Sequence, residues 1–173
     1  MTERDSGPST AYLGLGSNLG DSRALLREAL EKLPEAVHGR LLRVSPLYIT
    51  EPWGVTDQPP FLNCAVAVET ALAPDALLCA LKRLEAEAGR EAGPRWGPRP
   101  LDIDILLYDD LTLAAADLTI PHPRMLARRF VLQPLADIRP PGLPLLGASI
   151  EDRLAAVAEQ DVRLLAPDGW SEK

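Results

Sequence analysis

The chain alternates between short apolar runs of strand character and longer stretches in which apolar residues recur at helical spacing. Residues 11–16 form the first apolar run and predict a strand. Leucines and alanines then recur every three or four residues behind Asp21, whose carboxylate can accept hydrogen bonds from the free N–H groups of a first helical turn. Pro34 and Gly39 are expected to end this helix. The pattern therefore predicts a strand followed by an amphipathic helix.

A second set of elements follows the same pattern. Two strands are predicted over residues 41–50 and 61–70, which are rich in large apolar and β-branched residues, and the first is expected to be irregular at Pro46. A leucine stripe then predicts a helix that ends before Gly89. The apolar run 101–108 predicts another strand. The order strand-helix-strand-strand-helix-strand is that of a ferredoxin-like α+β fold.

The C-terminal third adds elements beyond this core. We expect a hairpin over 111–120, helices over 124–135 and 150–159, and an edge strand over 161–165. Ser149 precedes the last helix and, with an aspartate three residues later, resembles a capping box. The sequence therefore predicts a three-layer ferredoxin-like sandwich with a C-terminal helical extension.

Length and composition indicate one soluble domain. The 173 residues suffice for a single hydrophobic core, and we expect a flexible tail at 1–9, a domain at 10–166 and a second tail at 167–173. No apolar stretch approaches the ~18 residues of a membrane-spanning helix, and the polar N-terminus lacks the apolar region of a signal peptide. Cys64 and Cys79 are expected to be reduced, buried thiols. We therefore expect a cytoplasmic protein without a membrane partner.

Charge argues against a general nucleic-acid binder, because the net charge is −7 and the pI is about 4.9. Arginines nevertheless gather in two places, and such clusters either form a local anion site or lie on a solvated surface. The two clusters are Arg90, Arg95 and Arg99, and Arg124, Arg128 and Arg129.

Two loops rich in proline and glycine are predicted at 51–60 and 90–100. Proline makes such loops locally stiff, as expected of segments that close over a substrate. Trp96 in the second loop could stack on a flat ring or could anchor the loop.

Asp102 and Asp104 are the strongest candidates for chemistry. Side chains alternate along a strand, so these two carboxylates share one face while Leu101, Ile103 and Ile105 share the other. Adjacent carboxylates repel unless a cation neutralises them, and hard oxygen ligands favour Mg²⁺. The alternative is an ordinary solvent-facing strand surface. The neighbouring arginines favour the metal, because arginine, Mg²⁺ and phosphate form a consistent set.

Two weaker signals lie elsewhere. Phe61 and Asn63 share a strand face, where an aromatic ring could stack on a flat heterocycle and a carboxamide could bind its edge, although a core phenylalanine and a capping asparagine would look the same. His122 lies between two prolines that fix its backbone for a phosphate or ribose contact, although a lone histidine is often incidental.

Familiar nucleotide motifs are absent. The glycines at 14, 16 and 20 have the spacing G-x-G-x-x-x-G, which is not a dinucleotide-binding fingerprint. The sequence also contains no P-loop motif.

Taken together, these segments resemble the 6-hydroxymethyl-7,8-dihydropterin pyrophosphokinase (HPPK) family. The matching stretches, in family order, are Gly16–Asp21, Thr50–Gly54 through Gln58–Asn63, Arg95–Asp104, and Ile120–Arg124 through Arg128–Leu132. The resemblance implies transfer of the β,γ-diphosphate of the co-substrate ATP to the hydroxymethyl group of a reduced pterin, with release of AMP. We also expect small-molecule partners only, no nucleic acid, and a monomer.

The resemblance also implies residue roles. Two Mg²⁺ ions would be held by Asp102 and Asp104, which would act in catalysis with Arg90 and Arg99. The pterin would contact Thr50, Trp53, Phe61, Asn63 and Phe130. ATP would contact Glu85, Trp96, Arg99, Ile105, Thr119, His122 and Arg128. Whether a protein base such as Asp104 removes the hydroxyl proton stays open.

Two departures from the family pattern affect the arginines. The stretch 91–94 lacks a cation that family members often carry there, and Asp117 stands where some members have arginine. Two alternatives stay open at this point: a non-catalytic ferredoxin-like ligand-binding module, and an RNA-binding sheet.

Overall fold

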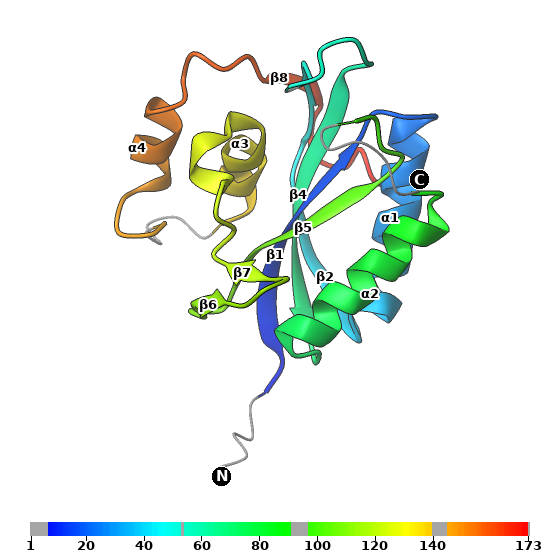
Figure 1. The fold of residues 1–173 in the computed structure, drawn as a ribbon, viewed down its shortest axis with the longest axis vertical. Helices are drawn as coiled ribbons and strands as arrows, with labels where there is room; N and C mark the ends of the chain where they lie inside the picture. Colours follow the sequence, from blue (N-terminus) through cyan, green and yellow to red (C-terminus); the bar gives the residue numbers. More distant parts are fainter. Residues whose placement is uncertain (1–6, 53, 91–96, 140–144, 173) are drawn as a thin grey trace.

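The computed structural model describes residues 7–52, 54–90, 97–139 and 145–172, and Figure 1 shows its arrangement. An antiparallel sheet forms the middle layer, in the order β5-β1-β4-β3-β8, with β2 also paired to β4. The bounds of its strands are β1 (Ser9–Ser17), β2 (Gly39–Val44), β3 (Leu47–Thr50), β4 (Phe61–Thr70), β5 (Asp102–Tyr108) and β8 (Arg163–Ala166).

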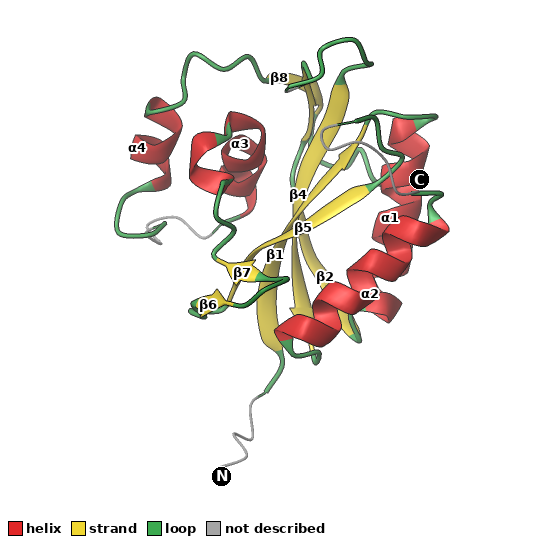
Figure 2. Cartoon of the chain, in the orientation of Figure 1, coloured by secondary structure: helices red, strands yellow, loops and turns green. Residues whose placement is uncertain are grey.

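Helices cover both faces of the sheet, as Figure 2 shows. On one face lie α1 (Ser22–Ala36) and α2 (Pro74–Glu87), and on the other lie α3 (Arg129–Ile138) and α4 (Ile150–Ala155). Each face has its own apolar core. Leu13, Leu26 and Leu81 belong to the first, and Leu106 and Leu132 to the second. The predicted three-layer ferredoxin-like sandwich is confirmed.

The second predicted strand is interrupted at Pro46. β2 ends at Val44 and β3 begins at Leu47. The Ser45 N–H donates to the carbonyl of Ala65 at 2.9 Å, and the Ser45 hydroxyl accepts from the Ala65 N–H at 2.9 Å. Side chain and backbone of Ser45 thus replace the ladder bonds that proline cannot make.

Several predicted helix ends were wrong. Pro34 lies inside the last turn of α1, which continues to Ala36 before His38 adopts a positive φ of 51°. The helix predicted over 124–135 divides into a 3-10 turn, η1 (Met125–Ala127), and α3, because Arg128 is extended, and α3 then continues to Ile138. The last helix, α4, is shorter than predicted, although Ser149 caps it as expected by accepting from the Asp152 N–H at 3.1 Å.

The predicted hairpin is present as β6 (Leu113–Ala114) and β7 (Thr119–Ile120), and the predicted edge strand as β8. Beyond β8, the chain differs from the expected tail at 167–173. The Trp170 side chain is 4% exposed and its Nε1 donates to the carbonyl of Ser45 at 2.9 Å, while Arg27 donates twice to the Trp170 carbonyl. Residues around Trp170 therefore belong to the packed body. No helix in the described ranges has the length and apolar character needed to cross a membrane.

Candidate active site

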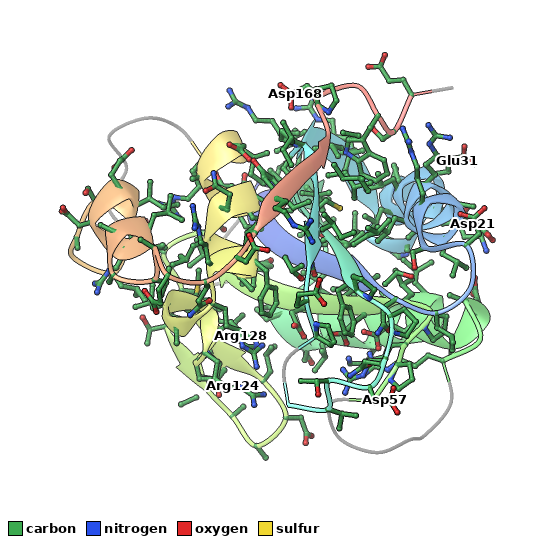
Figure 3. All side chains as sticks on the ribbon, turned by 90° about the horizontal axis from the view of Figure 1, so that it is seen from above. Asp21, Glu31, Asp57, Arg124, Arg128 and Asp168 are labelled. Atoms are coloured by element: carbon green, nitrogen blue, oxygen red, sulfur yellow. The ribbon has the colours of Figure 1, made fainter. Side chains whose placement is uncertain are left out.

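A cavity of about 280 Å³ lies on the sheet face that carries α3. Its floor comes from β1, β4 and β5, and its opposite wall from the segment around η1 and the first turn of α3. Figure 3 shows Arg124 and Arg128 beside one another on that wall, near the start of α3. The cavity therefore lies between the ferredoxin-like core and the layer added to it.

Asp102 and Asp104 line this cavity together. Leu101, Ile103 and Ile105 are buried on the opposite face of the sheet, each no more than 3% exposed. The predicted alternation of faces is therefore confirmed, and β5 directs both carboxylates into the cavity.

Arginines neutralise Asp102. Its Oδ1 accepts hydrogen bonds from Arg90 at 2.7 Å and from Arg99 at 3.1 Å. Arg90 also contacts the carboxylate of Glu85 at 2.5 Å. Two cations thus already offset the charge of Asp102, and both lie within reach of an anion bound beside it.

Asp104 has no comparable partner among the described residues. Its side chain is 38% exposed and opens on the cavity. The surrounding protein and the charge of Asp102 raise its pKa to about 6. The nearest cationic candidate is His122, whose Nε2 lies 4.0 Å from Asp104 Oδ2. Burial and the charges of Arg128 and Arg124 lower the pKa of His122 to about 4. The imidazole is therefore neutral at pH 7.

Main-chain bonding holds His122 beside this pair. Its N–H donates to the carbonyl of Leu106 in β5 at 2.9 Å, and its Nδ1 accepts from the Arg124 N–H at 3.2 Å. Because Nδ1 is an acceptor, Nε2 carries the proton of the neutral ring. His122 therefore presents an N–H donor toward the carboxylate end of the cavity.

Aromatic and amide groups form the other end of the cavity. Phe61 and Asn63 come from β4, Thr50 from β3, and Phe130 from α3. Asn63 is 6% exposed, and its Nδ2 donates to Thr50 Oγ1 at 2.8 Å. The guanidinium of Arg128 lies over the Phe130 ring, 5.6 Å from its centroid. This end combines flat apolar surfaces with one fixed carboxamide, an arrangement suited to a planar heterocycle.

Three residues expected to contact ATP do not line the cavity. Glu85 is 2% exposed beneath β5, where its Oε1 accepts from the Ile103 N–H at 2.7 Å. The Ile105 side chain lies in the core on the opposite sheet face, and Thr119 lies on the hairpin strand β7. Glu85 acts on the cavity through its contacts with Arg90 and β5, and its charge contributes to raising the pKa of Asp104.

Asn18, buried at the end of β1, joins the two predicted loops. Its Nδ2 donates to Gln58 Oε1 and to the Pro59 carbonyl, both at 2.9 Å. Its Oδ1 accepts from the Arg99 N–H at 2.8 Å, and its own N–H donates to the Arg99 carbonyl at 3.0 Å. One side chain thereby fixes the described parts of both loops at the cavity rim.

Sequence reasoning missed several lining residues. The cavity also contacts Gly14, Gly16, Glu51, Gly97, Arg124 and Val131. Glycine at alternate positions of a predicted strand was the available signal for Gly14 and Gly16. Arg124 belonged to a noted arginine cluster but received no role. Trp53, Trp96, Arg95 and the stretch 91–94 lie outside the described residues.

The cysteines form no disulfide, and they differ in exposure. Cys64 is buried under the cavity, and burial raises the pKa of its thiol to about 12. Cys79 on α2 is exposed, so the expectation that both thiols are buried was wrong for it.

Metal ligands in the described part of the chain are sparse. These residues contain no group of three or more histidines, cysteines, aspartates or glutamates that could hold a metal ion. Two carboxylates alone fit Mg²⁺, which usually completes its shell with water and phosphate oxygens. They would not suit a structural zinc, which takes four protein ligands.

Comparison with known proteins gives the family of this chain. The family model for 7,8-dihydro-6-hydroxymethylpterin-pyrophosphokinase (HPPK) matches residues 12–140. The 2-amino-4-hydroxy-6-hydroxymethyldihydropteridine pyrophosphokinase of Pseudomonas aeruginosa is 51% identical over 132 residues, which are 75% of this chain and 80% of that protein. The protein of the same name from Methylorubrum extorquens is 46% identical over 145 residues, 84% of this chain and 91% of that protein.

Among solved structures, wild-type Plasmodium falciparum HPPK-DHPS superposes with a TM-score of 0.70 at 16% sequence identity. The superposition covers 89% of this chain but only 45% of that one. The likeness establishes a shared fold for the part of the longer chain that matches.

Proposed function

Because this chain belongs to the 7,8-dihydro-6-hydroxymethylpterin-pyrophosphokinase family, we propose that the cavity between β5 and α3 is its active site. The chain transfers a pyrophosphoryl group from ATP to 6-hydroxymethyl-7,8-dihydropterin, a reaction of folate biosynthesis. In addition, we assign particular residues of the cavity to the pterin and others to Mg²⁺ and ATP.

One observation carries this assignment: a single cavity joins a binding surface for a flat ring to a carboxylate pair surrounded by arginines. Phe61 and Phe130 contribute the apolar surface, while Asp102 and Asp104 lie at the other end. Transfer requires that acceptor and donor meet, and proximity within one enclosed site supplies much of the rate enhancement.

The pterin occupies the aromatic end. Its ring stacks between Phe61 and Phe130, and the carboxamide of Asn63 bonds its polar edge. Thr50 holds that carboxamide through the 2.8 Å hydrogen bond. Trp53 is proposed as a further contact on the family resemblance alone.

Asp102 and Asp104 would hold the two Mg²⁺ ions that the family resemblance implies, at the carboxylate end. Mg²⁺, when bound, offsets the charge of the triphosphate and of the group in transfer. Arg90 and Arg99, which bind Asp102 here, would be able to donate to phosphate oxygens once a cation offset the charge of that aspartate.

His122 and Arg128 bind the nucleotide from the opposite wall. A neutral imidazole N–H and a guanidinium are both donors to phosphate or ribose oxygens. Glu85, Ile105 and Thr119 act on the nucleotide through their main chain or their neighbours, and Trp96 is proposed from the resemblance alone.

The chemical step is an in-line displacement at phosphorus. The hydroxymethyl oxygen forms a bond to the β-phosphorus, the bond from the β-phosphorus to the α,β-bridging oxygen breaks, and AMP leaves with that oxygen. As the base we propose Asp104, the carboxylate of the cavity that is not bound by Arg90 or Arg99, and the hydroxyl proton would pass to it or to solvent. We also propose that the protein acts as a monomer in the cytoplasm.

The test of this assignment is product analysis. Purified protein with ATP, Mg²⁺ and the reduced pterin alcohol should release AMP and the pterin diphosphate in equal amounts. Formation of ADP as the sole nucleotide product would contradict diphosphate transfer. Omission of Mg²⁺ should abolish release, and undiminished turnover in excess chelator would remove the metal assignment.

A further inference from the structure

Two glycines of β1 lie in the floor of the cavity, on the strand between β4 and β5. Gly14 and Gly16 of β1 both line the cavity, and neither has a side chain to project into it. We propose that Gly16 determines acceptor specificity. Because Gly16 has no side chain, the Asn63 carboxamide keeps the orientation in which it can hydrogen-bond the pterin edge, and the space between Asn63 and Asp102 stays open. This inference rests on the proposed assignment of the aromatic end to the pterin.

Strand register places Gly16 at the midpoint of the site. In the antiparallel pairing of β1 with β4, Gly16 lies opposite Asn63. In the pairing of β1 with β5, the same residue lies opposite Asp102. Neighbouring strands are roughly 5 Å apart, so the acceptor-binding amide and the metal carboxylate are separated by two strand spacings with only Gly16 between them.

The Asn63 carboxamide occupies the space into which a side chain at Gly16 would project. A Cβ built on Gly16 would lie 3.0 Å from Asn63 Oδ1 and 3.8 Å from Phe61 Cδ1. The first distance is tighter than ordinary van der Waals contact, so the carboxamide would have to shift. Its other atom, Nδ2, is held by Thr50, so the amide cannot move without strain in that hydrogen bond.

Gly14 provides the natural comparison two residues along the same face. A Cβ on Gly14 would meet only side-chain atoms of Leu106, at 3.6 Å and beyond, which is ordinary contact distance. Gly14 lies opposite Ala65 and Asp104 rather than opposite Asn63. A methyl group at Gly14 is therefore accommodated, whereas one at Gly16 displaces the amide.

The main chain does not itself require glycine at Gly16. The described glycines with positive φ are Gly20, Gly54, Gly89, Gly147 and Gly169, and Gly16 is not among them. Alanine can therefore adopt the same backbone conformation. A methyl group at this position is a probe of the cavity and leaves the strand intact.

The first experiment compares Gly16→Ala with Gly14→Ala in steady-state AMP release. For Gly16→Ala we expect the KM for the pterin to rise at least tenfold, with the KM for ATP within twofold of wild type. The Gly14→Ala variant should show a clearly smaller rise in pterin KM. Equal rises for both variants, or an equal rise in the KM for ATP, would overturn the inference.

The second experiment is a double-mutant cycle read by calorimetric binding of the pterin. If Gly16 acts through Asn63, Gly16→Ala should weaken binding strongly in the wild-type background and by less than twofold in Asn63→Ala. A loss of the same size in both backgrounds would overturn the inference. Because binding needs no turnover, a wild-type protein that released no AMP would contradict the proposed function while the cycle still decided the role of Gly16.

Discussion

Glu85 accepts a hydrogen bond from the main-chain N–H of Ile103 at 2.7 Å, and so ties helix α2 to β5 between the two aspartates of the site. The same carboxylate contacts Arg90, which in turn bonds Asp102. A side chain outside the cavity lining thus positions the strand that carries Asp102 and the arginine that binds Asp102.

The first prediction concerns this buried carboxylate. Glu85→Ala leaves the Ile103 N–H without its partner, and an unpaired buried donor costs about 1–3 kcal/mol. Glu85→Gln keeps an acceptor for Ile103 but loses the charge that holds Arg90. Urea unfolding should show the larger loss for alanine, while kcat should fall in both variants. A glutamine variant with wild-type kcat would argue against positioning through Arg90.

Removing either aspartate should abolish most activity. Asp102→Asn and Asp104→Asn each remove one hard negative ligand, and we expect kcat to fall by about 100-fold or more. The melting temperature of Asp102→Asn should change little, because Arg90 keeps Glu85 as a partner. That of Asp104→Asn should not fall, because burial and the charge of Asp102 disfavour the ionised Asp104 that it replaces. The exposed Asp110→Asn serves as a matched control with wild-type activity. Near-normal turnover in the Asp104 variant would remove it from the metal site.

Metal affinity should depend on pH through Asp104. Metal binds the ionised carboxylate, and the pKa of Asp104 without metal is about 6, so Mg²⁺ affinity should fall by about tenfold per pH unit below pH 6.

The raised pKa of Asp104 also affects the stability of the metal-free fold, which should decrease as pH rises whereas metal affinity increases. The native state holds this proton more tightly than the unfolded state, so the Asp104 contribution to the free energy of unfolding falls as pH rises from 3.8 to about 6.

Calorimetric titration with Mg²⁺ at several pH values measures the pH dependence of Mg²⁺ affinity. The slope should be weaker in Asp104→Asn, which has no carboxyl to titrate there. A slope that persists unchanged in this variant would assign the pH dependence to another group.

Arg124 is expected to contribute to nucleotide binding. It lines the cavity together with His122 and Arg128, and its charge lowers the pKa of both. Arg124→Ala should raise the KM for ATP about 5- to 20-fold, since charge-assisted hydrogen bonds contribute about 1–2 kcal/mol. The pterin KM should change little. The exposed Arg40→Ala is the control for loss of one positive charge.

Trp170 should stabilise the fold from the C-terminal segment. Trp170→Ala removes a buried aromatic side chain and should cost about 3–5 kcal/mol in guanidinium unfolding. Trp170→Phe keeps most of the packing but leaves the Ser45 carbonyl without its donor, at about 1 kcal/mol. Leu164→Ala, at a position 60% exposed, should stay within about 0.5 kcal/mol of wild type. An unchanged midpoint for Trp170→Ala would mean that the segment does not stabilise the domain.

Periodicity in the sequence was enough to predict the fold order and the orientation of the aspartates. Alternation along 101–108 placed Asp102 and Asp104 on one face because a strand allows only two faces. Helical spacing identified α1 and α2 for a similar reason. Both predictions depend only on the spacing of residues that are close together in the sequence.

Features that depend on distant partners were not predictable in this way. Nothing local indicates that Trp170 would pack beside Ser45, or that Glu85 would bind β5. The register that sets Gly16 between Asn63 and Asp102 depends on the pairing of three strands. The break before α3 arises because Arg128 is extended, which helical periodicity alone does not reveal.

The unequal exposure of the two cysteines gives the protein a natural attachment point for a spectroscopic label. Thiol reagents react with the thiolate, so the buried Cys64, with a pKa near 12, should stay unmodified while Cys79 is alkylated. Cys79 lies on α2, on the opposite side of the sheet from the cavity. A fluorophore attached there can follow folding and domain tumbling in the unmutated chain without entering the site where the substrates bind.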